Sequence, residues 1–147
     1  HGLEGTVVHN PRSNMNNAVG YANPVRFPNP IALGTDGIGA DMVDEFRVAY
    51  VRLREQDVEQ TPDPVWSMLD VNADLFPESR DDVVTWSYDD MDPWKLAFTT
   101  GVSPTHITID GQTVMEDGRL TQVDASEIRA KAAEAAQRLF RKIEELT

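Results

Sequence analysis

Two short polar motifs hold the side chains of this sequence whose types and spacing could do chemistry. The first is Gly34-Thr35-Asp36-Gly37, in which a carboxylate follows the apolar run Ile31–Leu33. An aspartate at the carboxyl end of a buried parallel strand would face the crevice in which α/β proteins bind ligands. The flanking glycines would let the backbone turn sharply and let a ligand approach. The alternative is a turn aspartate that accepts hydrogen bonds from its own backbone.

The second motif is His9-Asn10-Pro11-Arg12-Ser13-Asn14, at the end of the β-branched run Thr6–His9. It gathers an imidazole, a guanidinium, a hydroxyl and two amides within six residues. The alternative is a polar loop whose Asn and Ser side chains satisfy its own backbone. Both motifs follow successive predicted parallel strands. They should therefore face the same mouth, where barrel enzymes place their chemistry.

The elements that must position these motifs alternate between strand and helix. Apolar runs bounded by turn residues predict buried strands over 6–9 and 31–33. The polar, proline-containing stretch from 10 to 30 predicts a long loop between them. Apolar spacings of three and four predict an amphipathic helix over 41–55, and a shorter helix is expected over 64–75. Both strands are apolar enough to lack a wet face, which is typical of parallel strands covered by helices.

The second half of the chain has a different character. It predicts a strand over 82–88, a helical turn over 94–98 and a hairpin over 106–115. The hairpin is centred on Asp-Gly, which suits a type I′ turn because both central residues need positive φ. A last helix should begin at Asp124 with a capping box, its apolar stripe formed by Ile128, Ala132, Ala135, Leu139, Ile143 and Leu146.

Charge and composition exclude several classes of function. The 147 residues include 13 basic and 25 acidic side chains, so the formal net charge is -12. Nucleic acid and an anionic membrane would be repelled by most of this surface. No apolar run is long enough to span a bilayer and no signal peptide opens the chain. Cysteine is absent, which excludes disulfides and thiolate-bound metal and suits a reducing compartment such as the cytoplasm.

Other site motifs are not matched. The acidic segment 36–45 lacks the ligand order of a calcium loop, and its glycines form neither a dinucleotide fingerprint nor a phosphate loop. The three histidines are His1, His9 and His106, and none forms a metalloprotease pair. His106 is expected to be structural, and His1 is expected to end a truncated helix.

Taken together, the two motifs resemble the amidohydrolase superfamily. The resemblance rests on NPRSNMNN (10–17), on 20–22 and on LGTDGIGADM (33–42). It is closest to the chlorohydrolase and aminohydrolase branch that includes guanine deaminase, and within it to the SsnA-type aminohydrolases. Residues 82–84 and 107–118 are similar to the small β-sandwich that closes these proteins.

This resemblance implies a fold and a site. The fold would be α/β: the C-terminal part of a (β/α)₈ TIM-type barrel, then part of a β-sandwich and a C-terminal helix. Asp36 would lie beside or on a divalent metal, zinc or iron, and carry a proton from the metal-bound water to the leaving nitrogen. The metal would lower the pKa of that water, so that metal-bound hydroxide attacks. The substrate pocket would be lined by His9, Asn10, Ser13, Asn14 and Gly37.

The sequence also departs from the family. The His-x-His of strand one, the histidines of strands five and six and the nearby Glu have no counterpart here, and a barrel needs about 250 residues. A metal site also needs three or more protein ligands. The chain is therefore expected to be a C-terminal fragment, inactive and unstable alone because its sheet edge is unclosed. Residues 1–76 would be barrel strands seven and eight, 77–120 the sandwich segment and 121–147 the terminal helix.

The predicted activity is hydrolysis of non-peptide carbon–nitrogen bonds in a small molecule, most simply deamination. Two alternatives stay open. One is a non-catalytic binding or scaffold relative without metal ligands, and the other is a chlorohydrolase or amide hydrolase using the same site. The C-terminal helix would pack on its own barrel, or serve an interface between copies of the chain.

Overall fold

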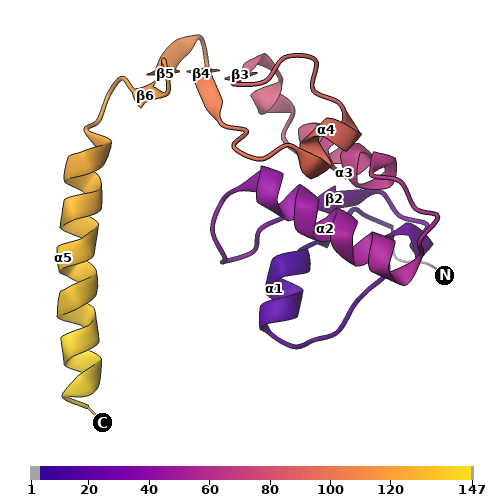
Figure 1. The fold of residues 1–147 in the computed structure, drawn as a ribbon, viewed down its shortest axis with the longest axis horizontal. Coiled ribbons are helices and arrows are strands. Elements are labelled where there is room, and N and C mark those ends of the chain that lie inside the picture. Colours follow the sequence, from indigo (N-terminus) through magenta and orange to yellow (C-terminus); the bar gives the residue numbers. More distant parts are fainter. Residues whose placement is uncertain (1–3, 147) are drawn as a thin grey trace. The chain divides into compact units, whose positions relative to one another are not determined.

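The computed structural model describes residues 4–146, so the expectation for His1 lies outside the described residues. The chain divides into two compact units, 4–80 with 88–102, and 81–87 with 103–146. The elements of the first unit are β1 (Val7–His9), α1 (Pro11–Asn16), η1 (Pro24–Arg26), β2 (Ile31–Leu33), α2 (Met42–Gln56), α3 (Asp63–Leu75) and α4 (Pro93–Phe98) (Figure 1). A 3-10 turn, η2 (Pro77–Asp81), follows α3.

The first unit is built on a parallel pair of strands, as the sequence predicts. β1 pairs with β2 in the register Val7 with Ile31 and His9 with Leu33. Helices α2 and α3 both contact β2, and α4 contacts α2. Their packed side chains form the core, which contains Ala32, Leu33, Val43, Phe46, Ala49, Tyr50, Leu53, Val65, Met68 and Leu96.

The amphipathic helix α2 begins where its sequence provides a cap. The Asp41 carboxylate accepts hydrogen bonds from the backbone N–H groups of Val43 and Asp44, both at 3.0 Å. These bonds satisfy two amides that have no partner inside the helix. The helix buries its 43, 46, 49, 50 and 53 positions, which confirms the predicted stripe.

Two expectations for the N-terminal third are wrong. Residues 11–16 form a short helix rather than a loop, because Pro11 stands at the first helical position, where its fixed φ favours a helix start. Val8 exposes 49% of its surface, so β1 has a wet face in this structure. Of the two strands, helices α2 and α3 pack mainly against β2, so the Val8 side of β1 stays uncovered.

The outer edge of β2 is occupied by a side chain. His9 lies opposite Leu33 in the parallel ladder, but its backbone hydrogen bonds go to the neighbours of Leu33. One of them is the 2.9 Å bond from the Gly34 N–H to the His9 carbonyl. The backbone groups of Leu33 therefore point away from β1. There the Leu33 N–H donates to Asn72 Oδ1 at 2.8 Å, and Asn72 Nδ2 donates to the Leu33 carbonyl at 2.7 Å.

The second unit is an antiparallel sheet followed by a helix. Its elements are β3 (Val83–Trp86), β4 (Pro104–Ile109), β5 (Gln112–Glu116), β6 (Arg119–Leu120) and α5 (Ala125–Glu144). The strand order is β3-β4-β5-β6. Asp110 and Gly111 have φ of 48° and 72°, which confirms the predicted hairpin turn, and a second turn at Asp117-Gly118 repeats the same values.

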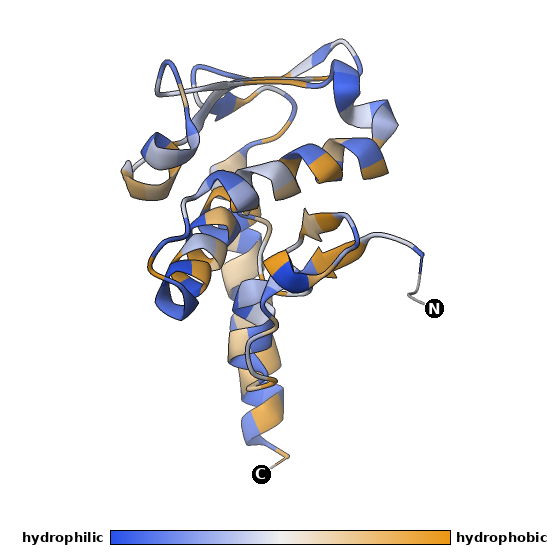
Figure 2. Cartoon of the chain, turned by 90° about the vertical axis from the view of Figure 1, so that its right-hand side faces the viewer, coloured by the Kyte–Doolittle hydropathy of each residue, from blue (hydrophilic) through white to orange (hydrophobic). Residues whose placement is uncertain are grey.

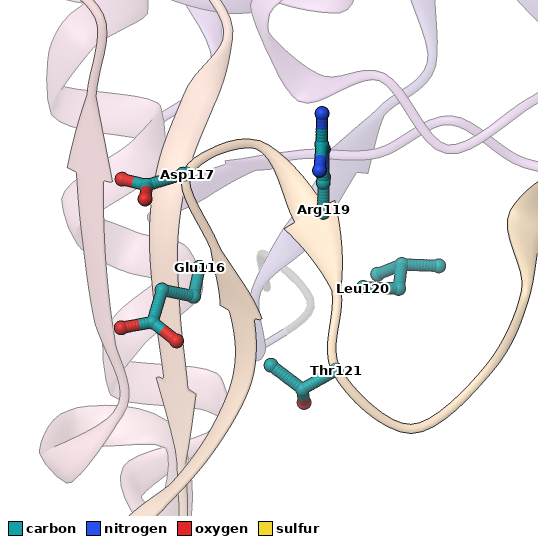
Figure 3. A pocket seen from close by; sticks show the side chains of 5 residues that line it. All are labelled: Glu116, Asp117, Arg119, Leu120 and Thr121. Carbon is teal, nitrogen blue, oxygen red and sulfur yellow. The ribbon is translucent and has the colours of Figure 1, made fainter.

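The region beside that second turn is hollowed. A concavity of about 480 Å³ is lined by Glu116, Asp117, Arg119, Leu120 and Thr121 (Figure 3). Four of these residues belong to β5, the turn and β6, and Thr121 directly follows β6, so the hollow lies along this hairpin.

Helix α5 begins at the predicted cap, where the Asp124 carboxylate accepts from the backbone N–H groups of Ser126 and Glu127. Apolar and polar residues alternate along it (Figure 2), and none of its residues is buried. It ends before Leu146, so the predicted stripe is one residue shorter. Among residues 4–146, no helix combines the length and apolar character needed to cross a membrane.

Candidate active site

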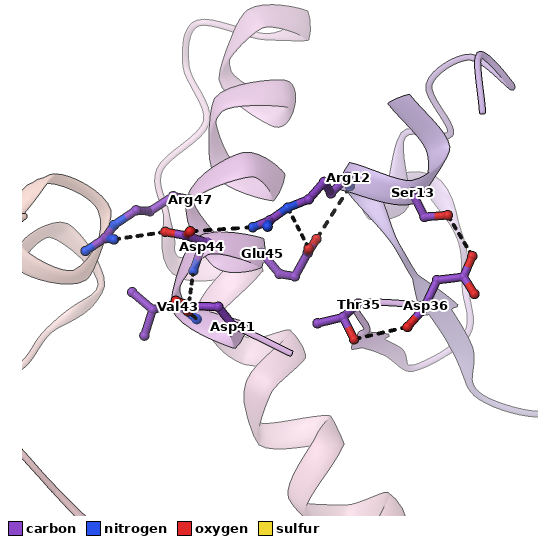
Figure 4. Close-up of polar contacts among 9 residues, drawn as sticks. All are labelled: Arg12, Ser13, Thr35, Asp36, Asp41, Val43, Asp44, Glu45 and Arg47. Atoms are coloured by element: carbon purple, nitrogen blue, oxygen red, sulfur yellow. Dashed lines mark hydrogen bonds and ion pairs between the residues drawn. The ribbon is translucent and has the colours of Figure 1, made fainter. Parts of the chain in front are cut away.

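The structure joins the two predicted motifs by a hydrogen bond. Ser13 lies on α1, which begins two residues after β1 ends, and Asp36 lies three residues after the end of β2. Because β1 and β2 are parallel neighbours, both motifs leave the sheet at the same end. The Ser13 hydroxyl donates to Asp36 Oδ2 at 2.6 Å (Figure 4). This length is typical of a hydrogen bond to an ionised carboxylate.

The direction of the Ser13 hydroxyl is set by a second contact. Asn17 Nδ2 donates to Ser13 Oγ at 3.2 Å and occupies one acceptor position of that oxygen. The single hydroxyl proton is then free to point at Asp36. Ser13 is 3% exposed, whereas Asp36 is exposed. The buried Ser13 hydroxyl therefore holds one oxygen of a carboxylate that stays exposed to solvent.

The Asp36 backbone adopts the left-handed conformation, with φ of 53°. Aspartate and asparagine enter this region more readily than most residues with a side chain. The carboxylate accepts its hydrogen bond from Ser13 on another element, so the structure does not match the simple turn aspartate that caps its own backbone.

His9 is a buried side chain of the first motif. It ends β1, is 5% exposed, and its Nε2 has no hydrogen-bond partner. The ring of Tyr21 meets it edge-on, with centroids 6.4 Å apart. Burial lowers the pKa of His9 below its ordinary value of 6.5. The neutral imidazole is therefore the dominant form at neutral pH.

The other predicted pocket residues belong to the same two motifs. Asn10 is half-buried at the position before α1 and makes no capping bond with its side chain. Asn14 lies on α1 beside Ser13 and is partly exposed. Gly37 follows Asp36, is exposed, and has open space where a Cβ would lie. Contact with a substrate stays a prediction for all of them.

Gly34 is required for close approach of β1 and β2. A Cβ at Gly34 would lie 2.3 Å from Asn10 Oδ1 and 2.7 Å from Val8 Cγ1. We expect Gly34→Ala to lower the free energy of unfolding by about 1–3 kcal/mol, because both side chains must move. Urea unfolding of the full-length protein measures this. Gly37→Ala is the matched control, and an equal effect of the two changes would contradict the prediction.

Two further residues, Arg12 and Glu45, contact each other beside this site and were not predicted to do so. Arg12 Nε lies 2.9 Å from Glu45 Oε1, and Glu45 on α2 is fully buried (Figure 4). Their separation in sequence is 33 residues, and no local pattern links them. The sequence offered one hint of this contact: Glu45 interrupts the otherwise apolar face of α2 between Val43 and Phe46.

The donors of the described chain do not make a complete metal site. Within residues 4–146, no three or more His, Asp or Glu side chains gather where they could hold a metal ion. Asp36 fits a single ligand position, since it is exposed and only its Oδ2 is engaged by Ser13. Any metal bound here would therefore need most of its ligands from elsewhere.

Comparison with known proteins gives a fold. No protein-family model matches the sequence. Among solved structures, the chain is similar to an adenosine deaminase from Xanthomonas campestris that was crystallised with bound zinc, with a TM-score of 0.68 and 18% sequence identity. The match covers 92% of this chain and 38% of that one. The chain thus has a mixed helix and strand fold that corresponds to part of that protein, and it spans well under half of its length.

Proposed function

We propose that this chain is the C-terminal part of a metal-dependent hydrolase of the amidohydrolase type, which acts on non-peptide carbon–nitrogen bonds. The observation that carries the proposal is the Ser13–Asp36 pair at the shared end of two parallel strands. The likeness in fold to part of a zinc-bound adenosine deaminase supports it. In this proposal β1 and β2 are the last two strands of a barrel, and β3–β6 belong to a sandwich.

Asp36 would act as the proton carrier. Ser13 holds Oδ2, so Oδ1 is the oxygen left to take up a proton and release it to the departing nitrogen. A carboxylate placed within reach of the reacting groups is suited to this role. His9, Asn10 and Asn14 would line the substrate pocket beside it.

The metal would be zinc or iron, with Asp36 beside it or as a ligand from this chain through Oδ2, whose second lone pair the hydrogen bond from Ser13 leaves open. A divalent ion bound there would supply the Lewis acidity that makes a water molecule nucleophilic near neutral pH. The remaining ligands would come from preceding parts of the protein. The substrate would be a small molecule, and we propose that the protein works in the cytoplasm, with α5 available for an interface between copies.

The proposal is tested by product analysis with the full-length protein. It should release ammonia from an amino-substituted nitrogen heterocycle or an amidine, when a panel of such compounds is followed by an ammonia-coupled assay. Release of chloride or of a carboxylate instead would assign the site to a chlorohydrolase or an amide hydrolase. Absence of any product from the panel would contradict the aminohydrolase proposal.

The second candidate function is a non-catalytic relative. It would lack metal ligands in the rest of the protein as well as in residues 4–146, where no three-donor cluster is found. The gene sequence upstream of the codon for His1 separates the two candidates. A strand ending in His-x-His, and later two separate histidines with a nearby Glu, would support the enzyme. An upstream region without them would leave Asp36 with no partners and favour the non-catalytic protein.

A further inference from the structure

The buried polar side chains of the described chain gather around one small helix. Among residues 4–146 these are His9, Ser13 and Glu45. Two of them flank or belong to α1, and Glu45 faces α1 from α2. Glu45 is 0% exposed, and burial raises its pKa although Arg12 opposes that shift. Because an ionised carboxylate is costly to bury, the buried position of Glu45 requires a partner that offsets this cost.

Glu45 contacts α1 through both its oxygens. Oε1 lies 2.9 Å from Arg12 Nε, which makes an ion pair, although this oxygen accepts no well-aligned hydrogen bond. Oε2 accepts a long hydrogen bond, 3.4 Å, from the Arg12 backbone N–H. That N–H belongs to the first turn of α1, where amides have no partner inside the helix. Since the Asn10 side chain makes no capping bond, Glu45 caps α1 from a different element.

Glu45 itself is held in place by the rest of α2. Its neighbour Asp44 lies 3.8 Å from the Arg12 guanidinium and 3.3 Å from Arg47. Arg47 donates in turn to the carbonyl oxygens of Leu96, at 3.1 Å, and Thr99. Glu45 thus belongs to a helix, α2, that is tied to α4 and the residue after it by the hydrogen bonds of Arg47. Among the described residues, helix α1 has no such bonds to α4.

Helix α1 depends on such an anchor. It has six residues, three of them Asn or Ser, which favour helices poorly. A helix this short is not stable by itself. Ser13, which holds Asp36, follows Arg12 directly in this helix. The position of the Ser13 hydroxyl therefore depends on where α1 is held.

We propose that Glu45 is a positioning residue that anchors α1 through Arg12, so that Ser13 holds the Asp36 carboxylate in its working orientation. This rests on the proposed function, in which Asp36 carries the proton. Glu45 touches neither Asp36 nor a substrate, and it acts through Arg12 and Ser13.

The test is a double-mutant cycle in the full-length protein, using Glu45→Gln and Ser13→Ala. We expect each change to lower kcat by about 10- to 100-fold with KM nearly unchanged, because misplacement of a catalytic group by about 1 Å has such effects. The double variant should be no slower than Ser13→Ala alone, since both changes remove the same support. Additive effects would overturn the proposal, because they would mean that Glu45 acts independently of Ser13.

The matched control is Glu55→Gln, which removes a surface carboxylate paired with Arg52 on the same helix. It should leave kcat unchanged. Hydrogen exchange in the metal-free protein adds a readout that does not depend on activity. The amides of Asn14 and Asn17, which close α1, should exchange at least about tenfold faster in Glu45→Gln than in Glu55→Gln. Equal protection in the two variants would overturn the anchoring role.

Arg12→Lys provides a second route if Glu45→Gln does not fold. It keeps a positive charge beside Glu45 but loses the planar guanidinium contact. It should show the same non-additivity with Ser13→Ala. The Asp36→Asn variant separates the two proposals. Full activity in Asp36→Asn would overturn the proposed function and the role of Glu45 with it. If Asp36→Asn loses activity but the effects of Glu45→Gln and Ser13→Ala are additive, only the Glu45 proposal is overturned.

Discussion

Replacing Asp36 with asparagine in the full-length protein is expected to lower kcat by about 10²–10⁴-fold, the usual contribution of a positioned acid–base group. This change alters the chemistry of the side chain but little of its shape. Asparagine tolerates the left-handed backbone at this position, with φ of 53°, and its side-chain oxygen can still accept the hydrogen bond from Ser13. The variant should therefore fold normally and lack the carboxylate that takes up the proton and is proposed to contact the metal.

Steady-state kinetics and urea unfolding of the same preparations check this prediction. Asp70→Asn is the matched control, because it makes the same chemical change at an exposed aspartate on α3. Its kcat should equal that of the unmodified protein. Turnover by Asp36→Asn at the unmodified rate would show that Asp36 carries no proton in the reaction and would sink the proposed role.

Removal of the proposed metal is expected to have the second large effect. Treating the full-length protein with a chelator is expected to lower kcat by at least about 100-fold, because Lewis-acid activation contributes several kcal/mol to such reactions. Adding back Zn²⁺ or Fe²⁺ should restore activity, and elemental analysis should follow the recovery. Which ion restores it identifies the working metal.

Two outcomes would count against this prediction. Undiminished turnover after the metal content has fallen to background would exclude the metal-dependent reaction. Failure of the untreated protein to hold any metal would favour the non-catalytic relative. Circular dichroism before and after chelation serves as the control, since a lost fold would also lower the rate.

Periodicity and turn chemistry explain why much of the fold could be predicted. The β-branched run before His9 and the apolar run before Gly34 were recognisable as strands, and they pair as parallel neighbours. The spacing from Val43 to Leu53 was sufficient to place α2. The hairpin turn at Asp110-Gly111 followed from the need for positive φ. Each of these signals is local, so a single sequence can show it.

The elements that were missed depend on contacts between distant residues. The polar composition of residues 11–16 argued for a loop. Pro11 favours a helix start there, and the contact between Arg12 and Glu45 adds a support that no local pattern shows. The exposed face of Val8 depends on which helices cover the sheet. For the candidate site, Asp36 and Ser13 were predicted to share one mouth. Their direct bond required the register of β1 and β2.

The side chain of Asn72 has a consequence for how a larger sheet would be completed. Its amide imitates a neighbouring strand, because it offers Leu33 one acceptor and one donor at 2.8 and 2.7 Å. A further strand that joined β2 at Leu33 would have to displace this amide and replace both bonds with its own backbone. Asn72 therefore protects this part of the edge from pairing with another chain, since both backbone groups of Leu33 already have partners.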